Sequence, residues 1–149
     1  MSGSGVAAAP QMETLIAKGV VFTVVGTCML IAVALYAQST REFLRTSVVV
    51  PGRVIRLNAG PYHPEIAFTT LAGEKVEYAQ GGGVSVQDGE AVEVRYAPDA
   101  PRMTPQMNTF GAIWGAVLAL GGMSMVFFVV GVVQLRSGVR AWRSRRKRA

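Results

Sequence analysis

The sequence predicts a membrane α+β fold in which two transmembrane helices flank a small antiparallel domain of four to five β-strands. Residues 19–37 and residues 110–135 form two runs without a charged residue. Residues 46–104, which lie between these runs, alternate apolar and polar side chains as half-buried strands do. The 149-residue chain is half apolar and has a mean hydropathy of +0.33, which is high for a protein with only 16% charged residues.

Both uncharged runs are long enough to cross a bilayer. As helices, they would span about 28 Å and about 39 Å, against about 30 Å for the hydrocarbon core. A buried soluble core and, for the first run, a cleaved signal peptide are weaker alternatives, because few residues remain to cover two apolar helices and the first run is long for a signal peptide. The predicted parts are a cytoplasmic N-terminal segment (1–18), two transmembrane helices (19–37 and 110–135), an extracytoplasmic β domain (38–109) and a basic cytoplasmic tail (136–149).

The distribution of charge sets the predicted orientation. The chain carries a net charge of +6, of which residues 1–18 contribute nothing and residues 38–109 contribute −1. Because basic residues favour the cytoplasmic side, we expect both termini in the cytoplasm and the β domain outside a bacterial inner membrane. We also expect the basic tail to meet anionic lipid, with a tryptophan at the headgroup level, and not nucleic acid. The residues concerned are Arg136, Arg140, Trp142, Arg143, Arg145, Arg146, Lys147 and Arg148.

The strand pattern of the β domain places apolar side chains on one face. Residues 72–74 and 87–90 read as turns, because each contains a glycine that can adopt a positive φ. An earlier β-branched run, residues 47–57, is interrupted by Pro51 and Gly52, which predicts a bulge or an edge position there. The alternating sets are Ile66, Phe68 and Thr70, then Val76 and Tyr78, then Val92, Val94 and Tyr96.

Little in the sequence predicts chemistry. One cysteine and one histidine exclude a disulfide within the chain and a Cys/His zinc site from one copy. His63, the one possible base of a catalytic triad, stands in a proline-flanked loop, and no Gly-x-Ser-x-Gly elbow accompanies it. Neither predicted span holds an ionisable residue, so a carrier or channel would require several copies. We therefore expect a non-enzymatic protein without a catalytic site, metal or cofactor.

Small residues in both spans predict close helix packing, either between the two helices or between copies of the chain. Gly111 and Gly115 form a GxxxG pair that Ala119 extends, and small residues also recur along the first span. The expected packing residues are Gly111, Gly115 and Ala119 in the second helix, and Gly19, Thr23 and Thr27 in the first.

Two stretches of the β domain carry a family resemblance. Residues 62–70 read Tyr-His-Pro-Glu-Ile-Ala-Phe-Thr-Thr, and Gly73 and Val76 follow them. Residues 88–101 read Asp-Gly-Glu-Ala-Val-Glu-Val-Arg-Tyr-Ala-Pro-Asp-Ala-Pro. Over roughly residues 47–135 the chain resembles the bacterial family called domain of unknown function 3592. That resemblance implies a helix, a small β domain and a second helix, and it implies no mechanism.

The expected function is binding. A β domain this small holds few large apolar residues, so we expect it to be stabilised by packing against its helices, a second copy or a protein partner. The main hypothesis is an accessory or assembly subunit of an envelope membrane complex. The alternatives are an immunity protein that neutralises a membrane- or periplasm-acting toxin, and a transporter or enzyme that is active only as an oligomer. The expected contact residues are Tyr62, His63, Pro64, Gly81, Gly82 and Gly83.

Overall fold

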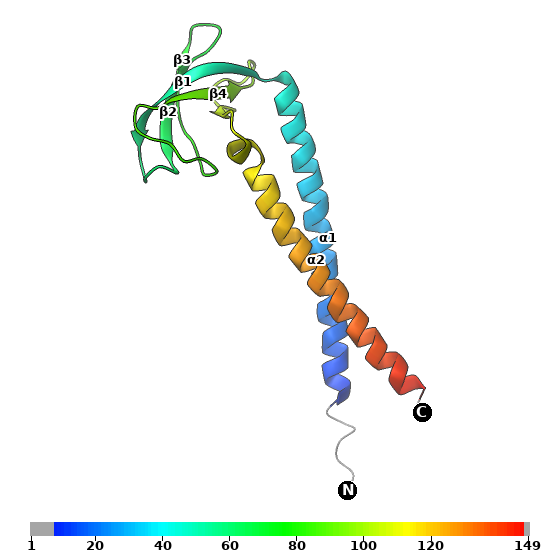
Figure 1. The fold of residues 1–149 in the computed structure, drawn as a ribbon. Coiled ribbons are helices and arrows are strands. Elements are labelled where there is room, and N and C mark those ends of the chain that lie inside the picture. The colour runs from blue at the N-terminus through cyan, green and yellow to red at the C-terminus, as the bar shows by residue number, and fades with distance from the viewer. Residues whose placement is uncertain (1–7, 148–149) are drawn as a thin grey trace. The chain divides into compact units, whose positions relative to one another are not determined.

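The computed structural model describes residues 8–147 as two helices and a five-stranded sheet (Figure 1). The chain divides into two compact units. One consists of the helical segments up to Ala34 and from Ala119 onward, and the other of residues 35–118. The second unit therefore contains the whole sheet, the last turns of the first helix and the first turns of the second.

Helix α1 runs from Ala8 to Thr46 and helix α2 from Phe110 to Arg146. Both are long and apolar enough to cross a membrane, with a mean hydropathy of 2.4 in their most apolar windows. Each helix extends beyond the uncharged run in which it was predicted, because the only proline in the added turns is Pro10, which lies in the first turn of α1, where a proline is tolerated. More than half of the large apolar side chains of these helices are exposed.

In the helical unit, α1 and α2 pack closely in antiparallel directions. A Cβ added at Gly19 would lie 2.6 Å from the Leu135 nitrogen, and one added at Gly26 would lie 2.5 Å from the Phe128 nitrogen. From Gly19 to Gly26 the position moves seven residues forward in α1, and the contacted residue moves seven residues back in α2. The two antiparallel helices therefore stay in register. Glycines permit this approach because they carry no side chain between the helices. The further contacts of this seam are Gly131 with Thr23, Gly138 with Ile16, and the stacked rings of Phe22 and Phe127.

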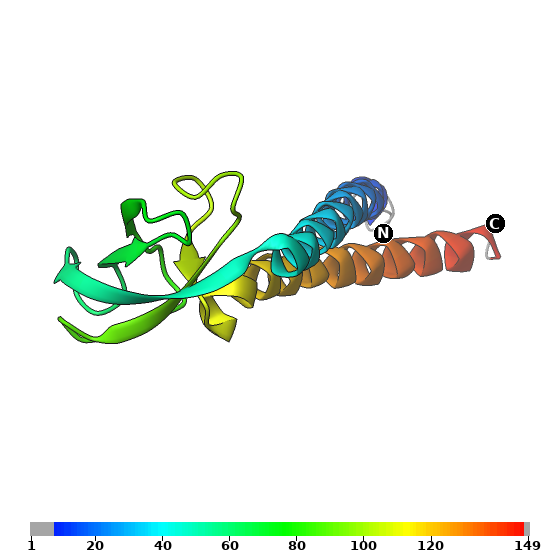
Figure 2. The ribbon, with the colours of Figure 1, turned by 90° about the horizontal axis from the view of Figure 1, so that it is seen from above.

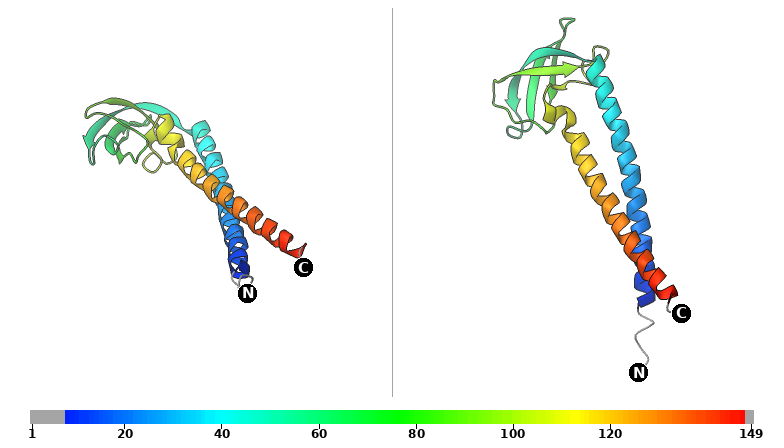
Figure 3. Two further views of the ribbon diagram at one scale, coloured as in Figure 1. Left: turned by 60° about the horizontal axis from the view of Figure 1, so that its bottom comes forward. Right: turned by 45° about the vertical axis from the view of Figure 1, so that its right-hand side comes forward.

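The five strands form one antiparallel sheet in the order β3-β2-β1-β4-β5, which confirms the predicted architecture of two long helices and a small antiparallel sheet. The sheet is strongly curled (Figures 2 and 3). Its two outer strands approach each other where the Met107 nitrogen of β5 donates to the Gln80 side-chain oxygen at 2.8 Å, directly after β3. The strands are β1 (Val48–Leu57), β2 (Pro64–Thr69), β3 (Lys75–Ala79), β4 (Ala91–Tyr96) and β5 (Gln106–Met107).

The core fills the inside of the curl. The Phe68 ring lies 5.3 Å from the Tyr96 ring and 6.0 Å from the Tyr78 ring, between centroids, which are favourable aromatic separations. The predicted alternation is confirmed, since Ile66, Phe68, Val76 and Val94 all point inward. The buried core residues are Val50, Val54, Ile66, Phe68, Val76, Val84, Val86, Val94, Tyr96 and Met107.

One detail of β1 differs from expectation. This strand is central and pairs with both β2 and β4, so Pro51 does not lie on an edge strand. The pairing with β2 begins only at Gly52, which leaves Pro51 unpaired on that side and makes its missing N–H tolerable. The irregularity lies a few residues later, between Val54 and Arg56. Both predicted turns are confirmed, with Gly73 at φ 82° and Gly89 at φ 75°.

Candidate partner-binding site

The loop residues predicted to contact a partner gather at one end of the sheet. The Gln80 nitrogen donates to the Pro64 carbonyl at 2.9 Å, and the Val86 nitrogen donates to the Pro61 carbonyl at 3.2 Å. These bonds bring the loop that contains Tyr62 and His63 beside the loop that contains Gly81 and Gly82. Tyr62 and His63 are exposed, whereas Pro64 is fully buried at the start of β2 and only supports the loop.

One of the three glycines predicted to contact a partner is packed against another element. Gly83 has a φ of +69°, and a Cβ at this position would collide with the Gly111 carbonyl in the first turn of α2. Gly111 was predicted to contact another helix, but its close neighbour is Gly83. The glycine pair therefore fixes the loop against the start of α2.

The other predicted helix-packing residues divide into two groups. Gly19 and Thr23 lie in the seam between α1 and α2. Gly115 has open space beside it in the part of the chain that the structure describes, and Thr27 and Ala119 are exposed. Gly26, Gly131 and Gly138 also lie in the seam and were not predicted, although the seven-residue spacings from Gly19 to Gly26 and from Gly131 to Gly138 are a signal in the sequence.

The basic residues predicted to set the topology extend α2 as exposed helical turns. Arg136, Arg140, Arg143, Arg145 and Arg146 are all exposed, as are Trp142 and Lys147. Arg148 lies outside the described residues.

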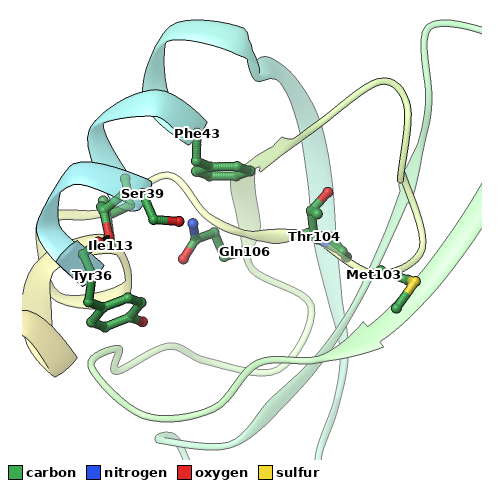
Figure 4. Close-up of a pocket in the computed structure, with 9 residues that line it drawn as sticks. Tyr36, Ser39, Phe43, Met103, Thr104, Gln106 and Ile113 are labelled. Carbon is green, nitrogen blue, oxygen red and sulfur yellow. Dashed lines mark hydrogen bonds between the residues drawn. The ribbon is translucent and has the colours of Figure 1, made fainter. Parts of the chain in front are cut away.

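A cavity of about 340 Å³ lies within the β-domain unit, and the sequence analysis did not predict it. Tyr36, Ser39 and Phe43 share one face of α1, because they are spaced by three and four residues. These side chains face the segment that joins β4 to β5, with Gln106 between them and Thr104 (Figure 4). The complete lining is Tyr36, Ser39, Thr40, Phe43, Met103, Thr104, Pro105, Gln106 and Ile113.

The cavity is uncharged but not purely apolar. The Thr40 hydroxyl donates to the Tyr36 carbonyl at 3.0 Å, and the Thr104 hydroxyl donates to the Ala100 carbonyl at 2.7 Å. Within the described residues, the side chains of Ser39 and Gln106 make no hydrogen bond. The cavity therefore combines aromatic and aliphatic side chains with two uncommitted polar groups.

Arg95 holds the walls of this cavity together. Its guanidinium donates to the Leu44 carbonyl at 3.3 Å and to the Ser47 hydroxyl at 3.0 Å, which ties the end of α1 to β4. The same group donates to the Asn108 side chain at 3.0 Å, and Asn108 donates in turn to Glu93 at 2.8 Å. A cation at the C-terminal end of a helix also interacts favourably with the helix dipole. One half-buried arginine thus links the end of α1, β4 and the segment that leads into α2.

Two large apolar side chains project from neighbouring loops, and one of them, Met103, also lines the cavity. Met103 is 89% exposed and Leu71 is 74% exposed, which makes them the most exposed large apolar residues among those that the structure describes. Their loops are joined, because the Leu71 nitrogen donates to the Tyr96 hydroxyl at 2.8 Å and Arg102 pairs with Glu74 at 2.6 Å. We call Leu71 and Met103 the apolar tip. Exposed apolar residues held on an anchored surface are typical of protein interaction sites.

No other arrangement in the described part of the chain points to chemistry. Residues 8–147 contain no group of three or more histidine, cysteine or acidic residues that could hold a metal ion. Burial raises the pKa of the Tyr78 phenol above its ordinary value, but this group packs against Phe68 in the core and does not face the cavity.

Comparison with known proteins decides the family. No family model matches the chain, and no solved structure matches it. Over 111 residues the chain is 37% identical to the protein named Immune protein Tsi4 of Pseudomonas aeruginosa, which covers 74% of this chain and 77% of that protein. The chain belongs to the family of the immune protein Tsi4. Among the functions predicted from the sequence, Tsi4 membership supports the immunity alternative and gives no support to the accessory-subunit hypothesis.

Proposed function

We propose that this Tsi4-family protein is an immunity protein that binds a toxic protein and prevents its action. The observation that carries the proposal is the 37% identity to Immune protein Tsi4 over three quarters of both chains. Immunity by binding requires a partner surface and no catalysis, so the protein acts stoichiometrically and not as an enzyme.

The contact surface in this proposal is the cavity together with the apolar tip. An apolar side chain of the toxin enters between Phe43 and Gln106, whose amide supplies a hydrogen bond, while Leu71 and Met103 pack on the surrounding surface. Buried apolar anchors with a few polar contacts supply most of the energy in protein interfaces. Arg95 contributes by holding the walls of the site, not by contact.

The setting of the proposed interaction is the outer surface of a bacterial inner membrane. Helices α1 and α2 cross the bilayer, the basic end of α2 lies in the cytoplasm, and the β domain faces outward. The length and apolar composition of both helices and the basic residues beyond Leu135 support this topology. The domain of unknown function 3592 family, which has the same layout, is the wider group in which we place the chain. An outward β domain would meet a toxin that acts on the membrane or in the periplasm before damage occurs.

A growth experiment tests the proposal in the protein's own host. The gene is deleted in cells that carry the toxin gene, and in cells from which adjacent genes, as candidate toxin genes, have also been removed. Deletion should be harmful only where the toxin is present, and the wild-type gene should restore growth. Deletion that is harmless in every background, or equally harmful in all of them, would contradict the immunity function.

The same cells test the proposed surface. Met103→Glu should fail to restore growth, because a charge on the apolar tip must be desolvated when the toxin binds. Ile55→Glu is the matched control, since Ile55 is also an exposed apolar residue of the β domain. Both variants should accumulate to the wild-type level. Equal protection by both variants would refute this surface as the toxin-binding site and would not contradict the immunity function.

A further inference from the structure

The C-terminal turns of α2 carry a strongly basic surface with no counter-charge. Six of the residues from Arg136 to Lys147 are basic and none is acidic. The ion pairs within residues 8–147 lie in the β domain, and none of them includes this segment. A helical segment with this charge requires an anionic partner or a large shell of counter-ions.

Four of the basic residues fall on one face of the helix. Arg136, Arg140, Arg143 and Lys147 are spaced by four, three and four residues, and such positions lie above one another on an α-helix. Arg145 points to the opposite side, about 180° around the axis at 3.6 residues per turn. We call the first four residues the basic stripe.

The basic stripe does not face α1. The residues of α2 that approach α1 are Phe128, Gly131, Leu135 and Gly138. Their mean direction differs from that of the basic stripe by roughly 130° at 3.6 residues per turn.

Toward the N-terminus, the face of the basic stripe continues through Val129 and Met125, which are exposed and apolar. One helical face therefore changes from apolar to basic without turning toward another element. A helix that passes from hydrocarbon into a layer of charged headgroups has this arrangement.

A tryptophan lies within the basic segment, on a side of the helix roughly 130° away from the basic stripe at 3.6 residues per turn. Trp142 is 47% exposed, and the Arg146 guanidinium lies 5.6 Å from the centre of its ring. Tryptophan prefers the headgroup region, where its ring is apolar and its N–H can find an acceptor. In this position above the ring, the Arg146 guanidinium is free to donate hydrogen bonds to phosphate oxygens.

We propose that the basic stripe is a binding site for anionic phospholipid headgroups, which fixes the axial position and rotation of α2 in the membrane. The inference rests on the membrane topology given under the proposed function, and it goes beyond toxin binding. Charge complementarity selects the lipid, because the stripe offers four cations in a row beside an apolar surface. Nucleic acid would supply the same phosphate chemistry but nothing for the adjoining Val129 face.

Quenching of a single tryptophan by brominated lipids tests the site in the full chain. Trp114→Phe leaves Trp142 as the only tryptophan, and this protein is reconstituted in phosphatidylcholine vesicles with increasing phosphatidylglycerol. Bromine is placed on the phosphatidylglycerol in one series and on an equal fraction of the phosphatidylcholine in the other. We expect quenching by phosphatidylglycerol to saturate at a several-fold lower fraction and to weaken in 0.5 M salt, roughly as screening predicts.

Matched substitutions distinguish lipid binding at the basic stripe from a general effect of positive charge. Arg143→Gln, in the basic stripe, should raise the half-saturating fraction of phosphatidylglycerol about fivefold. Arg145→Gln removes the same charge from the opposite face and should change that fraction less than twofold. Equal effects of the two substitutions, or equal quenching by the two lipids, would overturn the proposal.

Two other outcomes are informative. No quenching by either lipid would overturn both the lipid site and the membrane topology, while a growth experiment that shows protection would still support immunity. Retention of an oligoribonucleotide by the reconstituted protein, without any preference for phosphatidylglycerol, would overturn the lipid site in favour of nucleic acid.

Discussion

The glycine seam between α1 and α2 allows a substitution of one methyl group to be predicted in sign and size. In Gly26→Ala, the new Cβ would lie 2.5 Å from the Phe128 nitrogen and 2.7 Å from its Cα. Ordinary contacts begin near 3.4 Å. Because the colliding atoms belong to the backbone, no side-chain rotation relieves the contact, and the helices must separate by about 1 Å at this point.

A separation of this size weakens packing along the seam. A gap of about 1 Å forfeits roughly a quarter to a half of the dispersion energy of each contact that it opens. Overpacking of a tight interior typically costs about 1–3 kcal/mol. The higher helix propensity of alanine offsets about 1 kcal/mol of this cost at most, so we expect a net loss of up to roughly 2 kcal/mol.

Gly122→Ala is the matched control for this prediction. Gly122 lies in α2, the other apolar helix, and an added Cβ there has no atom within 4 Å. This substitution should leave stability unchanged or raise it slightly. Stability is measured by titrating the full chain in mixed micelles with increasing dodecyl sulfate and following tryptophan fluorescence. Equal midpoints for the two variants would refute the close seam.

Other predictions concern the β domain and use thermal unfolding of the full chain in mild detergent. Arg95→Ala should destabilise the domain by about 2 kcal/mol, since three part-buried acceptors lose their donor, and an unchanged midpoint would refute its anchoring role. Gly83→Ala should cost about 1–3 kcal/mol, because φ is +69° and the Gly111 backbone blocks the methyl group; a neutral result would show that this loop is not packed. Burial raises the pKa of Tyr78, so the unfolded chain loses the phenol proton first, and stability should fall as the pH rises above about 10. Tyr78→Phe should flatten that decline, and an unchanged slope would contradict it.

The architecture was predictable because its signals are local. An uncharged run is visible in a window of about 20 residues, and strand alternation is visible in six. Helix ends were less predictable, since α1 continues through residues 38–46, a largely polar stretch with three charged residues that is compatible with a helix. The position of the β1 irregularity was also missed, because it depends on the pairing with β2 and not on Pro51 alone.

The site could be predicted only in part, because its walls come from distant segments. Tyr36 and Ile113 lie in the two helices, while Met103 lies in a proline-rich loop, and no sequence pattern joins them. The loop residues Tyr62 and Gly81 were predicted to act together, and the structure places their loops side by side through the Gln80–Pro64 hydrogen bond. The function itself required a relative, since the residues that form a binding surface have no chemical signature of their own.

A binding measurement with the toxin is the most direct test of the proposal that this protein confers immunity by binding. The full-length protein is purified in mild detergent and mixed with the toxin identified by the deletion experiment, and the complex is resolved by size and mass. We expect a stoichiometric complex that Met103→Glu weakens and Ile55→Glu leaves intact. Recovery of the two proteins as separate species, in detergent and in reconstituted membranes alike, would contradict immunity by binding.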